Sequence, residues 1–331
     1  MDSEKPIPVA DLCFSDGTVV ILVENKMFRV HKSILAARSS VFRDMFEDQE
    51  SENSTVGFVD RGSAYFTFLT TILGKLLPTA EPKTSEMDVV EGYPVVRLHH
   101  SADDFEVFLR AIFDSSTFMP WLSSPRPHAA VIAAIFRLSH MYKIRYLYLR
   151  AMEHLYAYRH VSARPWRFNK YWLPGYDNLN PQELLVIIKA VMDVGAVWLL
   201  PGAYYHAFVV GAHLLPCPAN SGDESILHTL RVGSHNIMSQ TAKMSSFLAL
   251  SCTSARHKYL ADLLEALSKG VVSPTHYHER WVDRGKSTLC DPCFQATLLA
   301  YDAAMLEFWE KLPQHFGLPS WADLNRMSEN F

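Results

Sequence analysis

Two cysteines separated by two residues form the sharpest chemical spacing in this 331-residue chain: Cys290 and Cys293. Thiolates at this spacing can supply half of a tetrahedral zinc site, and Cys252 with His257 would complete it. The surrounding sequence also suits the start of a helix, in which the same cysteines stay reduced and bind no metal. We therefore expect no cofactor. Structural zinc at these four residues is the alternative, and a redox disulfide of the first pair is a further one.

The other patterns that could support chemistry are incomplete. Residues 284–288, Arg-Gly-Lys-Ser-Thr, imitate the end of a phosphate-binding loop, but Arg280 occupies the position of its first glycine. No nucleophile elbow, metalloprotease helix or paired-carboxylate motif appears in the sequence. Among the histidines, His31 fits a packed core residue, whereas His99 and His100, at a strand end, are expected to face solvent. We predict that the chain is not an enzyme; an uncharacterised enzyme is the remote alternative.

The composition limits the partners and the compartment. With 49% hydrophobic and 12% aromatic residues, the chain has ample material for folded cores. A net charge of −4 and the lack of any Lys/Arg run argue against a nucleic-acid partner. Five cysteines, an odd number, and a polar N-terminus without an apolar leader predict a reducing, intracellular location, either cytoplasmic or nuclear.

One apolar stretch raises the question of a membrane span. Residues 194–222 contain no Asp, Glu, Lys or Arg, and residues 196–215 are mostly apolar. A span needs about 20 such residues. Pro201, Gly202 and His206 interrupt the run, and no basic cluster flanks it. We therefore predict two buried helix segments that are broken near Pro201, and no membrane association.

The elements that must position these residues begin with a strand hairpin. Residues 18–23 form a continuous, β-branched apolar run that suits a buried strand, and residues 27–30 return after a turn at 24–26. The apolar period then changes to that of a helix, with Ser39 or Ser40 available to cap a second helical segment.

A second unit begins near Tyr93. Residues 95–98 form a short strand candidate, and Ser101 with Asp104 resembles a capping box. Five residues then follow the stripe of an amphipathic helix: Phe105, Phe108, Leu109, Ile112 and Phe113. Two more helical patterns follow, as far as about residue 155.

Two further features define the domain organisation. Residues 47–92 are unusually long for a connection inside a compact domain, and we interpret them as an insert. Past residue 160 the composition shifts; Asn180-Pro181 opens a helix plainly, and Gly195 is placed to end it. We predict an α+β protein. A small sheet packed with helices occupies residues 1–160, and a mainly helical domain occupies residues 161–331.

Residues 16–46, DGTVVILVENKMFRVHKSILAARSSVFRDMF, resemble the start of a BTB/POZ domain. The family pattern combines a hairpin, Phe-x-x-His at Phe28 and His31, Leu-Ala-Ala-x-Ser at 35–39 and a closing Phe-x-x-Met-Phe. Together with later helices the resemblance covers about residues 12–160, without the insert. The segments WLLPGAYYHA (198–207) and EKLPQHFGLPSWADL (310–324) are similar to a group of fungal BTB proteins.

The resemblance implies a homodimer formed by the N-terminal segment and the first helices. Its candidate interface residues are Leu12, Phe14, Ile34, Leu35 and Val41. Many animal BTB dimers also pair an Asp before the first strand with a basic residue after the His. Lys32 matches the basic position, but Thr18 stands where the Asp is expected and Asp16 lies two residues earlier.

The resemblance also implies that the chain works by binding proteins. One hypothesis is an adaptor for a cullin-type ubiquitin ligase, in which the N-terminal domain binds the cullin and the helical domain binds an unknown client protein. The alternative is a homo-oligomeric scaffold in transcriptional regulation, without ligase recruitment.

Overall fold

A computed structural model describes most of the chain: residues 6–53, 89–90, 92–119, 127–155, 180–212, 215, 224–246, 287 and 290–329. The chain packs as two compact units. The first consists of Met1–Asp114 and Met141–Ile144, and the second of Ser115–His140 and Arg145–Phe331. The expected boundary near residue 160 lies outside the described residues and stays a prediction.

The first unit is built on the predicted hairpin. Strand β2 (Val19–Val23) pairs antiparallel with β3 (Lys26–Val30), and Val23 faces Lys26 across the turn. Every residue of β2 is buried, which is why its sequence is a continuous apolar run. Glu24 takes a positive φ of 49° in the turn.

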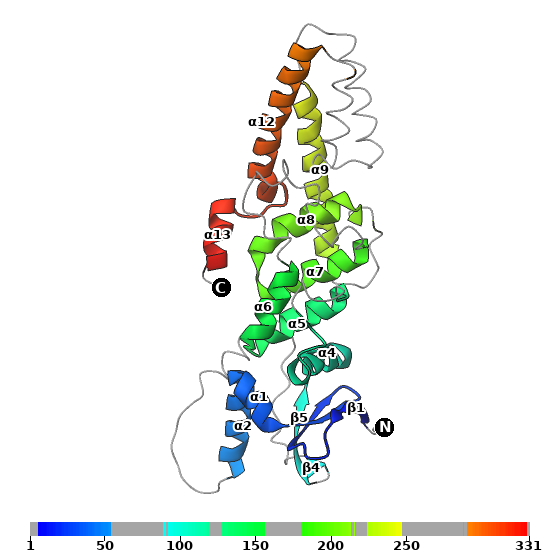
Figure 1. Cartoon of the computed structure of the whole chain (residues 1–331), viewed down its shortest axis with the longest axis vertical. Helices are drawn as coiled ribbons and strands as arrows, with labels where there is room; N and C mark the ends of the chain where they lie inside the picture. The colour runs from blue at the N-terminus through cyan, green and yellow to red at the C-terminus, as the bar shows by residue number, and fades with distance from the viewer. Residues whose placement is uncertain are drawn as a thin grey trace. The chain divides into compact units, whose positions relative to one another are not determined.

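Three further strands complete a sheet in the order β1-β3-β2-β5-β4 (Figure 1). Strand β5 (Tyr93–Leu98), which the sequence predicted, runs parallel to β2, and the short β4 (Val89–Val90) pairs with β5. Strand β1 (Ile7–Cys13) lies parallel to β3 at the opposite edge. The sequence did not predict β1, because within it Leu12 alone is buried and no apolar alternation marks it.

The first unit also contains three helices: α1 (Lys32–Arg38), α2 (Ser40–Asn53) and α4 (Ala102–Phe113). The core joins sheet to helix through Phe28 and Phe105, whose ring centroids are 5.8 Å apart. Four residues of the α4 stripe are buried, as predicted. Helix α2 continues past residue 47, so the start of the expected insert is helical and its end is β4.

The second unit is helical in the residues that the structure describes. Its elements are α5 (Ala129–Met141), α6 (Arg145–Leu155), α7 (Pro181–Val194), the 3-10 helix η4 (Val197–Leu199), α8 (Leu200–Val209), α9 (Glu224–Ser246), α12 (Asp291–His315) and α13 (Trp321–Glu329). A small sheet with helices followed by a helical region confirms the α+β fold class.

Helix α7 follows its sequence signals closely. Asn180 and Glu183 form a reciprocal capping box, Pro181 opens the helix, and Gly195 ends it in the left-handed conformation at φ 78°. The predicted break near Pro201 is also confirmed, because η4 passes into α8 there. Among the described residues, no helix is both long and apolar enough to cross a membrane.

Candidate protein-binding face

Helix α1 is a short helix that keeps most of its surface outside the core. Thr18 accepts a hydrogen bond from the Lys32 backbone N–H at 3.0 Å through its hydroxyl oxygen, and so caps the first turn. The Ser39 N–H closes the last turn on the Leu35 carbonyl. Leu35 is the buried residue of this helix, so the rest of α1 presents a face to solvent or to a partner.

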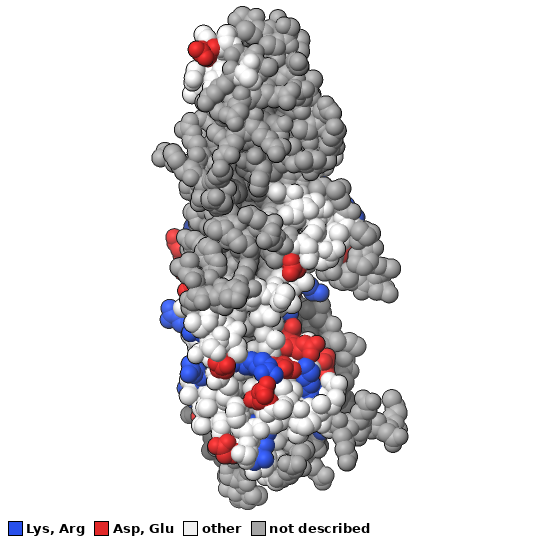
Figure 2. Space-filling model, turned by 45° about the vertical axis from the view of Figure 1, so that its right-hand side comes forward, with Lys and Arg blue, Asp and Glu red and all other residues white. Residues whose placement is uncertain are grey.

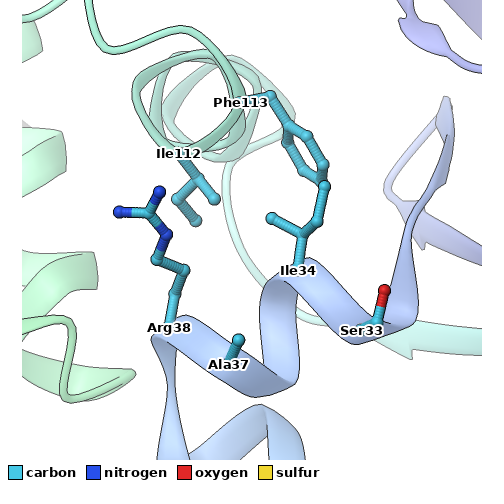
Figure 3. A pocket seen from close by; sticks show the side chains of 6 residues that line it. All are labelled: Ser33, Ile34, Ala37, Arg38, Ile112 and Phe113. Carbon is cyan, nitrogen blue, oxygen red and sulfur yellow. The ribbon is translucent and has the colours of Figure 1, made fainter.

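An open pocket of about 290 Å³ lies between α1 and the end of α4. It is lined by Ser33, Ile34, Ala37, Arg38, Ile112 and Phe113. Figure 3 shows Ile34 beneath the Phe113 ring, and the Arg38 side chain extending beside Ile112. The apolar lining suits an apolar side chain of a partner, while a guanidinium offers donors to a carboxylate or a carbonyl group.

The five predicted interface residues do not share one environment. Leu12 and Leu35 are 2% and 0% exposed, and therefore contribute to the core of their own unit. Phe14 and Val41 are half-buried, and the Phe14 ring packs 5.3 Å from that of Phe113. Ile34, with 36% of its surface exposed, is the member of the set most open to a partner. The interface itself stays a prediction.

The residues around His31 make their contacts inside the chain. The His31 Nε2 atom lies 3.5 Å from the Asp16 carboxylate, and the His31 ring packs against Phe14 at 5.2 Å. Lys32 instead extends over the Phe46 ring, 5.5 Å from its centroid. The predicted packing of His31 is found, but its side chain is 24% exposed, so the predicted position in the core is not.

A chain of ion pairs connects β1 and β3 to α4. Lys26 contacts Asp103 at 2.6 Å and Glu106 at 2.7 Å, while Arg110 contacts Glu106 at 2.9 Å and Asp11 at 3.1 Å. Hydrogen bonds to Asp103 and then to Glu106 raise the pKa of Lys26, and the Lys26 hydrogen bond lowers the pKa of Glu106. Figure 2 shows the two charge signs side by side in the lower part of the view. Asp103 and Asp11 are exposed, whereas Lys26, Glu106 and Arg110 are only partly exposed. We expect the pairs to orient α4 on the sheet and to add little stability.

His100 was predicted to face solvent, and this prediction was wrong. His99 is exposed, but His100 is half-buried and its ring stacks on Phe105 at 5.8 Å and 7°. Its Nε2 atom lies 2.7 Å from the Tyr142 hydroxyl oxygen. The sequence could not show this contact, because Tyr142 comes from a turn 42 residues further along.

The candidate zinc residues are only partly described. Cys290 is exposed and forms the N-cap of α12, with Pro292 in the first turn, which confirms the predicted helix start. Cys252, His257 and residues 284–286 lie outside the described residues, and the structure does not describe the Cys293 side chain. No group of three or more potential metal ligands occurs within the described part of the chain. Structural zinc stays a prediction.

The comparisons with known proteins bear on the first unit. A family model, that of the BTB/POZ domain, matches residues 13–69. The chain carries a BTB/POZ domain. The match begins at the end of β1 and includes the hairpin, α1 and α2. BTB/POZ domains mediate protein–protein interaction and oligomerisation, so the exposed face of α1 belongs to a module that binds proteins.

Neither curated proteins nor solved structures gave a match to the chain. The family match covers none of α4 or of the helical second unit. The similarity of residues 198–207 and 310–324 to fungal BTB proteins therefore stays a prediction.

Proposed function

We propose that this protein is an adaptor or scaffold, and that its BTB/POZ domain forms a homodimer through the face of α1. The observation that supports this proposal most directly is Ile34, an apolar residue beside the α1–α4 pocket with 36% of its surface exposed. Obligate homodimer interfaces are mostly apolar and commonly bury more than about 2,000 Å² in total. Ile34 would lie within such an interface.

Light scattering of the full-length chain at micromolar concentration tests the dimer. We expect twice the chain mass for the unmodified protein and the monomer mass for Ile34→Asp, because a carboxylate in a mostly apolar interface would lose its hydration on association. Leu149→Asp is the matched control, since Leu149 is 49% exposed on α6, in the other unit. A monomer at all concentrations, or a dimer that survives Ile34→Asp, would contradict the proposal.

The more specific form of the proposal divides the work between the two parts of the chain. The BTB/POZ domain would recruit a cullin-type ubiquitin ligase, and the helical second unit would bind a client protein. Affinity purification of the full-length chain from its native cell, followed by mass spectrometry, tests this form. A cullin among the specific partners supports the ligase adaptor; specific partners without a cullin favour the oligomeric scaffold in transcriptional regulation.

A further inference from the structure

The turn Met141–Ile144 packs with the first unit, whereas the rest of α5 and all of α6, on either side of it, pack with the second. Its anchor is Tyr142, which is 3% exposed. The Tyr142 ring stacks on Phe42 with centroids 4.3 Å apart and an interplanar angle of 8°. The Ser39 hydroxyl donates to the Tyr142 carbonyl oxygen at 2.6 Å. Main chain and side chain of Tyr142 are therefore both held by the first unit.

The contact between Tyr142 and His100 depends on the charge of the imidazole. Burial raises the pKa of the Tyr142 phenol, so the phenol keeps its proton at neutral pH. It can donate this proton to His100 Nε2, 2.7 Å away, only while that nitrogen is unprotonated. The imidazole ring also stacks on the Phe105 ring, which covers one of its faces.

We propose that His100 and Tyr142 form a pH-sensitive latch, which holds the turn Met141–Ile144 against the first unit while His100 is neutral and releases it when His100 is protonated. In the protonated state Nε2 becomes a donor, so the phenol must accept and its own hydrogen loses His100 as acceptor. The imidazolium must also remain half-buried beside Phe105, away from part of its hydration. This inference concerns regulation of the fold and does not rest on the proposed dimer.

The charges around His100 determine the direction of the pH response. Burial lowers its pKa from the ordinary value of 6.5; the neighbouring His99 lowers it further, and Asp104 on α4 opposes them. The closed latch therefore has its full stability above pH 6.5 and loses it as the pH falls from 6.5 through the lower pKa of the closed state. Each pH unit between the two pKa values changes the opening equilibrium by up to about tenfold.

Hydrogen–deuterium exchange of the full-length chain at about pH 7.5 and about pH 5.5 tests the latch. Protection of residues 141–144, corrected for the intrinsic effect of pH on exchange, should fall at the lower pH by up to about tenfold per unit. His100→Gln, which cannot titrate, should show little pH dependence, whereas His128→Gln, at an exposed histidine on another segment, is the matched control and should behave like the unmodified chain. Unchanged protection in the unmodified chain, or an equal fall in His100→Gln, would overturn the latch.

A second measurement keeps the test decisive should His100→Gln fail to fold. An NMR titration of the unmodified chain should show the His100 imidazole protonating below pH 6.5. In Tyr142→Phe, which keeps the ring stack but lacks the phenol, the fall in protection between the two pH values should become smaller. A His100 pKa at or above its ordinary value would refute the proposal.

Discussion

Ser39 links two segments that are 103 positions apart in the sequence. Its buried hydroxyl accepts from the Phe42 N–H at 3.0 Å, which caps α2, and donates to the Tyr142 carbonyl at 2.6 Å. Ser39→Ala should lower the free energy of unfolding by about 1–3 kcal/mol, because it removes a cap and leaves a buried carbonyl without its donor. Chemical denaturation measures the change. Ser115→Ala, at an exposed residue outside the face of α1, is the control and should stay within about 0.5 kcal/mol.

Gly233 in α9 is a residue at which the usual effect of alanine should reverse. Alanine in a helix is normally favoured over glycine by about 1 kcal/mol. A Cβ at this position, however, would lie 2.1 Å from Cδ1 of the Phe316 ring, which is buried and packs against Tyr204. We expect Gly233→Ala to destabilise the chain by about 1–3 kcal/mol through overpacking.

A double mutant tests this explanation of Gly233. In a Phe316→Ala background the clash is absent, so the Gly233→Ala change should become neutral or stabilising, as seen in the urea midpoint. An equal loss in both backgrounds would show that the ring contact is not the cause.

Which of these residues the sequence could predict depends on the distance over which they act. The cap at Ser39 and the box at Asn180 each act on an N–H group three residues away, so local sequence is sufficient to find them. The environments of His100 and Gly233 depend on Tyr142 and Phe316, which are distant in sequence. No local pattern identifies such pairs.

At the scale of the element, α7 provides a clean test of backbone conformation. Gly195 ends the helix at φ 78°, and a Cβ there would meet no atom within 4 Å. The cost of Gly195→Ala is therefore backbone strain alone, about 1–2 kcal/mol. Gly195→Asn should cost less, because asparagine tolerates the left-handed region better. Thermal unfolding of the two variants measures the difference, and equal losses would argue against this explanation.

An element is predictable from the sequence to the extent that it buries a side-chain pattern. Strand β2 buries a continuous apolar run, and helix α4 buries an apolar stripe. Both patterns are visible in the sequence, which therefore predicted both elements. Strand β1 stays mostly exposed and is held by backbone pairing to β3, which no side-chain pattern encodes. For the candidate site, the family resemblance proposed Ile34 as an interface residue, which stays a prediction, whereas the pocket depends on how the end of α4 meets α1.

At the scale of the whole molecule, the two units alternate along the chain. The first unit returns for Met141–Ile144 after α5 has begun the second. Helix α5 also contacts α7 through Arg137 and Asp193, whose charged atoms are 3.7 Å apart. The packing of the second unit therefore uses residues on both sides of position 160, the predicted domain boundary.

Cutting the chain at that boundary tests whether the two parts are independent. If α5 and α6 pack with α7 as one unit, residues 1–160 and 161–331 should bind each other when they are co-expressed as separate fragments. Residues 1–160 alone should aggregate, because the buried faces of α5, including Ile132 and Ile135, would lose part of their cover.

Size-exclusion chromatography of the co-expressed fragments measures their association, and Arg137→Ala should weaken it only slightly because this ion pair is partly exposed. A stable fragment 1–160 that does not bind fragment 161–331 would instead establish residue 160 as a true boundary. Each fragment could then be tested separately for its own partners.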